Sequence, residues 1–179
     1  VKPSSITYGI NPIGSTGTSE AAIRADVKAI FAAFVAANVD PSGAVWLMPT
    51  SVALSLSLVV NALGQPAFPN ITMNGGTFFG LPVVTAESAG FVSDASPTEK
   101  SVILCKPSEI LVADDGQVTI DTSSEASVQM DTAPTNPVVA ATVLISAFQQ
   151  NLLFIRAERF VNWKRARDAS VQMLGNVNW

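Results

Sequence analysis

The apolar side chains between residues 19 and 39 recur at steps of three, four and one, the spacing of a helix with one apolar face. The positions that form this stripe are Ile23, Val27, Ile30, Phe31, Phe34 and Val35. Thr18 or Ser19 can accept the free amides of the first turn, and the Asp-Pro-Ser-Gly segment at 40–43 ends the helix with a turn. We therefore predict an amphipathic helix over 19–39, the most strongly constrained element of the chain.

The segments on either side of this helix differ in character. Residues 1–18 are rich in Pro, Gly, Ser and Thr without any period, so we predict a flexible lead-in with poor order. Residues 44–48 (AVWLM) form a short apolar run that is typical of a buried strand. Residues 50–63 fit either a strand or one apolar face of a helix. Their length favours a helix, with Thr50 as its N-cap and Gly64 just after its end.

The middle of the chain reads as loops and short strands. Two prolines and a Gly-Gly pair predict a loop over 65–76, and Thr77–Thr85 is predicted as a strand that Pro82 places near a sheet edge. Residues 87–100 are irregular, and 101–106 (SVILCK) indicate a core strand. Short apolar runs at 110–112 and 118–120 flank Asp114-Asp115-Gly116, which predicts a hairpin.

The last third alternates again between helix and strand signals. After a loop at 131–136, Pro137 suits the first turn of a helix capped by Asn136 and running to about Gln150. From Leu153 onward apolar and charged residues alternate with a period of two, which predicts one long strand. The order of elements indicates an α+β fold with a mainly antiparallel sheet.

Charged residues make up only 13% of the chain against roughly 25% in soluble domains, while 48% is apolar. This balance fits a protein whose exterior is covered by neighbouring subunits. The most apolar stretches, 52–63 and 138–148, are too short to span a bilayer, so we predict no membrane segment. The chain starts at Val1 with no signal peptide, and we expect a fragment or processed product. A single cysteine excludes an intrachain disulfide and favours a cytoplasmic origin.

Familiar catalytic chemistry is excluded by the residues that are missing. With no histidine and one cysteine, the chain cannot form tetrahedral zinc sites or Ser/His/Asp and Cys/His catalytic sets. The Asp114-Asp115 pair beside Gly116 is better explained by a turn, and the Gly14–Gly17 segment lacks the strand and lysine of a phosphate loop. We predict no catalytic, cofactor or metal site. An enzyme that uses carboxylates would need a pocket of convergent acids with perturbed pKa values.

Two regions together resemble the major capsid proteins of tailed bacteriophages and prophages, which have the Hong Kong 97-type fold. Residues 148–167 (FQQNLLFIRAERFVNWKRAR) are similar to the family's C-terminal signature, a Phe-Gln pair, an Ile-Arg-Ala-Glu strand and a Trp near a basic end. Upstream, Trp46–Pro49, Asn61–Pro66 and Gly80–Val84 resemble a strand ending at proline, a helix running into a loop, and a Gly-x-Pro-Val strand. The matches cover about residues 20–170.

The resemblance implies a structural subunit that is not an enzyme. In this interpretation 19–43 and 132–179 form a peripheral-type domain with 19–39 as its long spine helix, and 44–131 form an axial-type domain that meets its copies around fivefold and sixfold axes. The family's N-terminal arm and extended loop have no counterpart here beyond the lead-in. The expected partners are copies of the chain in pentamers and hexamers, with a scaffold or maturation protease as further candidates. The expected location is the virion capsid, after synthesis in the bacterial cytoplasm.

The basic C-terminal end carries the candidate contact residues. Residues 156–179 have a net charge of +3, whereas residues 1–155 have −7. The signature and possible inter-subunit contacts are Arg156, Glu158, Arg159, Trp163, Lys164, Arg165 and Arg167. Ion pairs to neighbouring subunits or solvation are favoured over contact with packaged DNA, because the net charge is negative and no aromatic platform separates the basic residues. A bacterial nanocompartment shell, which shares the fold, is the alternative function.

Overall fold

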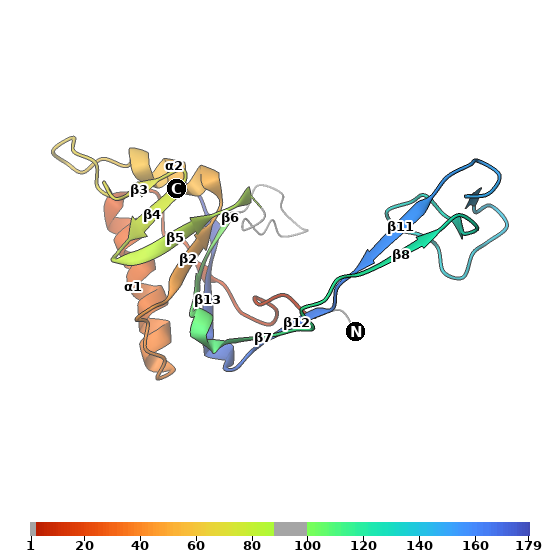
Figure 1. Ribbon diagram of the computed structural model, residues 1–179. Helices are drawn as coiled ribbons and strands as arrows, with labels where there is room; N and C mark the ends of the chain where they lie inside the picture. The colour runs from red at the N-terminus through yellow and green to blue at the C-terminus, as the bar shows by residue number, and fades with distance from the viewer. Residues whose placement is uncertain (1–2, 88–99) are drawn as a thin grey trace. The chain divides into compact units, whose positions relative to one another are not determined.

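A computed structural model describes residues 3–87 and 100–179 of the chain. The contacts divide it into two compact units, which we call the sheet unit (residues 1–112 and 163–179) and the ribbon unit (113–162) (Figure 1). The predicted irregular stretch 87–100 lies almost wholly outside the described residues. Within the described ranges, no helix is both long and apolar enough to cross a membrane.

The sheet unit is built on a seven-stranded mixed sheet with two helices (Figure 1). In spatial order its strands are β1 (Ile13–Gly14), β13 (Val171–Val177), β6 (Lys100–Cys105), β2 (Val45–Met48), β5 (Leu81–Thr85), β4 (Gly75–Phe78) and β3 (Ile71–Thr72). The pairs β1–β13 and β2–β5 are parallel and the other pairs are antiparallel. This confirms an α+β fold, although the sheet is more mixed than the sequence predicted.

Helix α1 (Glu20–Ala36) confirms the first predicted element and its cap. The Ser19 side chain accepts the backbone N–H of Ala22 at 3.3 Å. The stripe positions Ile23, Val27, Ile30 and Phe34 are buried in the main core. The predicted helix ran too far at its C-terminal end, because Asn38 takes a left-handed conformation (φ +55°) that ends the helix.

The core is centred on Trp46, which is fully buried in β2. Its indole N–H donates to the backbone oxygen of Phe78 at 3.0 Å, and its ring forms T-shaped contacts with the rings of Phe31 and Phe78. Strand β2 lies between β5 and β6, and residues 101–105 of β6 are all buried. The predicted strands at 44–48 and 101–106 are therefore confirmed.

Helix α2 (Thr50–Leu58) is shorter than the predicted 50–63. Thr50 is its first residue and not its cap, a position held by Pro49 without a side-chain bond, and Gly64 lies in the following loop. The helix stops because Val59 becomes extended, Val60 forms a β-bridge with Pro66, and the Asn61 side chain accepts the amides of residues 63 and 65. Val59 and Val60 are both β-branched, which favours the extended backbone over the helix.

The predicted single strand over 77–85 is a hairpin of β4 and β5. The chain turns at Phe79 and Gly80, both with positive φ, and the predicted loop at 65–76 contains β3 and the start of β4. Strand β5 is interior, between β2 and β4, so the edge position inferred from Pro82 was wrong. Pro82 is tolerated because only residues 83–85 pair with β2.

The lead-in, expected to be flexible, is engaged with the sheet unit over its described part. Ile13 and Gly14 form β1, which pairs with Leu174 and Gly175 of β13. Strand β13 itself had no counterpart among the sequence predictions, although Val171, Leu174 and Val177 are buried. The buried positions of β13 are three residues apart, and its register with β6 shifts after Leu174. The sequence therefore lacks the period of two by which a strand is recognised.

The ribbon unit consists of short antiparallel pairs. Its strands are β8 (Thr119–Ser123) paired with β11 (Phe154–Glu158), and β9 (Ser127–Val128) paired with β10 (Ile145–Ser146). Strands β7 (Ile110–Asp114) and β12 (Val161–Arg165) also pair, and their residues are divided between the two units. The predicted long strand from Leu153 is thus two strands, broken at Arg159 and Phe160.

The predicted hairpin around Asp114-Asp115-Gly116 is wrong. Strands β7 and β8 each pair with a strand from the end of the chain and not with each other. The turn signal itself is correct: the Asp114 carboxylate accepts the amide of Gly116 at 3.1 Å, and the Asp115 carboxylate accepts that of Gln117 at 3.2 Å. Such a turn redirects the chain without fixing which strand it pairs with next.

The predicted helix from Pro137 to Gln150 is also wrong. These residues form turns and the two-residue strand β10. Val138, Val139, Thr142 and Val143 are β-branched, which lowers helix propensity, and Val139 and Val143 stay exposed, so no packed face supports a helix.

The predicted domain boundaries differ from the division that the contacts give. Residues 19–43 were assigned to a different domain from 44–131, yet α1 shares one hydrophobic core with β2, α2 and β6. Helix α1 has 17 residues, and nothing identifies it as the long spine helix. The peripheral and axial assignments concern the assembled protein and stay predictions.

Candidate subunit-contact surface

The β8–β11 ribbon carries two exposed isoleucines on one face and an ion-pair group, together with Phe154, on the other. Its register pairs Ile155 with Thr122 and Ala157 with Ile120, and side chains alternate between faces with a period of two. Ile120 and Ile155 therefore lie on the same side, and they are 65% and 68% exposed. We call the side formed by Ile120, Thr122, Ile155 and Ala157 the apolar ribbon face.

The opposite side of the ribbon carries an ion-pair group. Arg156 donates through Nη2 to the Asp121 carboxylate at 2.8 Å, directly across the strand pair, and its Nε lies 3.4 Å from the Glu158 carboxylate. The hydrogen bond to Asp121 raises the pKa of Arg156 further. Arg156 and Glu158 share one face, as the sequence predicted, and both are satisfied within the chain.

Exposed apolar side chains extend beyond this face over the ribbon unit. They are Val118, Ile120, Val128, Met130, Val138, Val139, Val143, Leu144, Phe148, Leu152, Leu153, Ile155, Phe160 and Val161. A two-stranded ribbon with an uncovered apolar face is marginally stable in water. Large exposed apolar patches are typical of surfaces that associate with other molecules.

Arg159 is held at the base of the ribbon by Asp114. Its Nε donates to the Asp114 carboxylate at 3.1 Å, and its Nη2 contacts the second carboxylate oxygen. The hydrogen bond from Arg159 lowers the pKa of Asp114, with a further contribution from the Gly116 amide. The pair fixes the Asp114 turn, and Phe160 beside it stays exposed.

Trp163 and Arg165 of β12 bind the N-terminal lead-in within the sheet unit. The Trp163 indole N–H donates to the backbone oxygen of Ser4 at 2.9 Å, and Arg165 Nη2 donates to that of Tyr8 at 2.8 Å. Arg165 also pairs with Asp168 at 3.2 Å. These signature residues therefore have partners inside the chain.

Arg167 and Lys164 complete the predicted set. Arg167 forms a two-bond pair with Glu109 and donates to the backbone oxygen of Asn38 at 3.3 Å, whereas Lys164 is exposed on β12. The seven residues thus do not form one cluster, since residues 156, 158 and 159 belong to the ribbon unit and the other four to the sheet unit. The apolar ribbon face was missed, although the alternation from Leu153 that predicted a strand already contained half of it.

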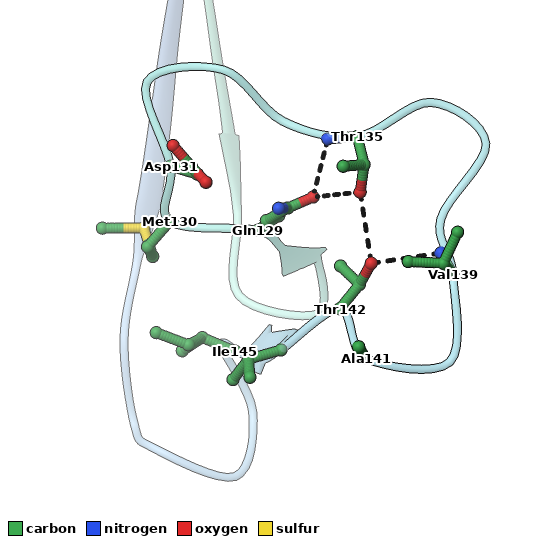
Figure 2. Close-up of a pocket in the computed structure, with 9 residues that line it drawn as sticks. Gln129, Met130, Asp131, Thr135, Val139, Ala141, Thr142 and Ile145 are labelled. Atoms are coloured by element: carbon green, nitrogen blue, oxygen red, sulfur yellow. Dashed lines mark hydrogen bonds between the residues drawn. The ribbon is translucent and has the colours of Figure 1, made fainter.

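A pocket of about 450 Å³ lies in the loop between β9 and β10. Figure 2 shows the loop held by a hydroxyl and amide network: the Gln129 side-chain oxygen accepts the Thr135 amide and hydroxyl, and Thr142 bonds both Thr135 and the Val139 amide. Asp131 is the one ionisable residue in its lining. The pocket therefore lacks the convergent acids that a carboxylate enzyme needs. Among residues 3–87 and 100–179 no cluster of His, Cys, Asp or Glu could hold a metal ion.

Comparison with known proteins shows which family the chain belongs to. The sequence profile of the phage capsid family matches residues 3–175. The chain belongs to the phage capsid family. The capsid polyprotein of Pseudomonas phage PAJU2 is 49% identical over all 179 residues, and these cover 26% of that protein. The family is one of structural capsid proteins, as the sequence resemblance implied.

Solved capsid structures share the fold. A Gordonia phage Cozz chain matches 97% of this chain with a TM-score of 0.62 and 13% identity. The capsid of an empty GTA particle, computed with C5 symmetry, matches 97% with a TM-score of 0.59 and 14% identity. A Mycobacterium phage Che8 chain matches 94% with a TM-score of 0.57 and 14% identity. Our chain spans 52%, 56% and 54% of these chains, and about a quarter of the polyprotein.

Proposed function

We propose that the chain is the body of a major capsid subunit, copies of which form pentamers and hexamers of an icosahedral phage or prophage head. The observation that carries this proposal is the apolar ribbon face. Ile120 and Ile155 are exposed on a two-stranded ribbon, which is marginally stable in water unless another surface covers its apolar side. Family membership and the capsid names of the relatives support the same function.

Weak contacts through the apolar ribbon face can hold a shell together because each subunit makes several of them. Covering one isoleucine contributes about 1.5–3 kcal/mol, so a single ribbon contact is weak. In a closed shell each subunit is held by several such contacts at once, and their effects multiply. The low charged fraction of the chain fits an exterior that is largely shared with neighbours.

For the two lobes we propose a division near residues 112 and 163. The shared core of α1, β2 and β6 supports one lobe built on the sheet unit, which we assign as axial-type. The ribbon unit is then part of the peripheral-type lobe. The spine helix predicted at 19–39 fits this division poorly, since α1 packs within the sheet unit.

We propose that the basic end serves internal pairing more than DNA contact. Arg156, Arg159 and Arg167 are each engaged by a carboxylate of this chain, which leaves little free positive charge for phosphates. The PAJU2 relative is named a polyprotein, and we infer that this chain is likewise released from a longer precursor by a maturation protease. A scaffold partner remains a prediction, and the phage names of the relatives favour a virion over a nanocompartment.

The apolar ribbon face can be tested against the polar face of the same strands. In the full-length subunit, Ile120→Thr with Ile155→Thr removes two apolar contacts while keeping β-branched residues, and Arg156→Thr alters the opposite face. We expect the double variant to shift the population from capsomers to monomers in analytical ultracentrifugation, with Arg156→Thr close to wild type. Normal capsomer formation by the double variant would refute the role of this face, and loss in Arg156→Thr alone would assign the contact to the polar face.

A further inference from the structure

Asp26 of α1 is a buried acid whose hydrogen-bond donors all come from one short segment. The residue is 1% exposed, and its carboxylate accepts the Ser15 hydroxyl at 2.8 Å, the Thr16 hydroxyl at 2.7 Å and the Thr16 amide at 3.0 Å. These donors are uncharged. We call residues 12–16 the N-terminal strap.

The carboxylate depends on the strap for its solvation. A buried carboxylate is tolerated only where hydrogen bonds or an opposite charge replace water. Here Ser15 and Thr16 supply every hydrogen bond that the structure gives this carboxylate within the described residues, so removing the strap leaves the charge without its donors until water enters. The strap is therefore held more tightly than its two-residue strand β1 would hold it.

The strap also joins the C-terminal segment. The Trp179 indole N–H donates to the Ser15 hydroxyl oxygen at 3.1 Å, and that hydroxyl in turn donates to Asp26. The Ser15 amide donates to the backbone oxygen of Gly175 at 3.1 Å. Gly175 is needed for this approach, because a Cβ there would lie 2.9 Å from the Pro12 Cβ.

We propose that Asp26 is a latch that closes the N-terminal strap and the C-terminal segment 171–179 onto α1 as one cooperative unit. Ser15 is the link, since it is both donor to Asp26 and acceptor from Trp179. The latch makes residues 12–16 and 171–179 depend on each other for their place against α1, a conformational device that goes beyond the shell function and does not depend on it.

Hydrogen exchange at single amides tests the latch in the intact chain. Asp26→Asn replaces one acceptor oxygen with an amide group, and we expect it to speed exchange of the Ser15 and Thr16 amides about tenfold or more, while β2 amides stay at wild-type rates. Trp179→Phe should speed the same two amides by a smaller factor. Asp131→Asn removes the same charge from an exposed side chain of the ribbon unit and should leave both amides unchanged.

Coupling between the two ends is the decisive outcome. If Trp179→Phe leaves Ser15 and Thr16 at wild-type rates, or if Asp26→Asn speeds β2 as much as the strap, the latch is refuted. Should Asp26→Asn not fold, Thr16→Val removes one donor while keeping the carboxylate, and it must speed the Ser15 amide for the proposal to stand.

Discussion

Arg167 and Glu109 face each other where the chain leaves the sheet unit and returns to it. Arg167 Nε lies 2.9 Å from one Glu109 carboxylate oxygen and Nη2 lies 2.5 Å from the other, a two-bond geometry. The Ala166 amide also donates to the backbone oxygen of Glu109 at 2.8 Å. The pair therefore joins the residue before β7 to the residues that follow β12.

This pair predicts a pH-dependent contribution to stability. The hydrogen bond from Arg167 lowers the pKa of Glu109 from its ordinary value of 4.5. A lowered folded-state pKa stabilises the protein above the ordinary value, and this contribution is lost as pH falls through the lowered pKa. We expect Arg167→Ala to lower Tm more at pH 7 than at a pH below that lowered value, where only its hydrogen bond to the Asn38 backbone oxygen is lost. Arg167→Lys, which keeps the charge without the two-bond geometry, should be intermediate. An equal loss of Tm at both pH values would contradict the ion-pair account.

Trp46 lies fully buried in the core, so we expect its substitution to lower the free energy of unfolding. Trp46→Phe keeps an aromatic ring but leaves the Phe78 backbone oxygen without its donor, which we expect to cost about 1–3 kcal/mol in the free energy of unfolding. Trp46→Ala should cost about 3–5 kcal/mol or prevent folding. Leu58→Ala, at a site 70% exposed, is the control and should stay within about 0.5 kcal/mol of wild type. Urea unfolding measures all three variants, and similar losses for Trp46→Phe and Leu58→Ala would be inconsistent with this core.

Gly76 of β4 lies where the backbone leaves no room for a side chain, so we expect its substitution to destabilise the protein. Its φ of +134° lies outside the range of L side chains, and an added Cβ would overlap the backbone oxygen of Asn70. Gly64→Ala is a matched control, since it too has positive φ (+77°) but open space around it, and should cost about 1–2 kcal/mol. We expect Gly76→Ala to cost clearly more than Gly64→Ala by urea unfolding. Equal costs would mean that the close approach to Asn70 does not matter.

The sequence predicted correctly those elements whose conformation follows from the residues within them. The stripe and cap of α1 and the short apolar runs of β2 and β6 were read correctly, since helix spacing and buried runs need no knowledge of the partner. The signals at 114–116 and from Leu153 were also real, because they mark a turn and extended chain.

The predictions that failed were strand pairings and a helix whose outcome depends on partners distant in sequence. Strand β7 pairs with β12 and not with the nearby β8, and β13 enters the sheet between β1 and β6. The helix predicted at 137–150 needed a packed face that the chain does not provide. As candidate contacts the sequence suggested charged residues and Trp163 but not Ile120, because the exposure of Ile120 is a property of the two-stranded ribbon.

The central claim is that the chain forms the body of a shell subunit, and electron microscopy of the full-length protein, produced with any scaffold it needs, tests it most directly. We expect rings of five and six subunits and closed particles, with the Ile120→Thr and Ile155→Thr double variant yielding few or none. A full-length protein that stays folded and monomeric under every assembly condition would contradict the account.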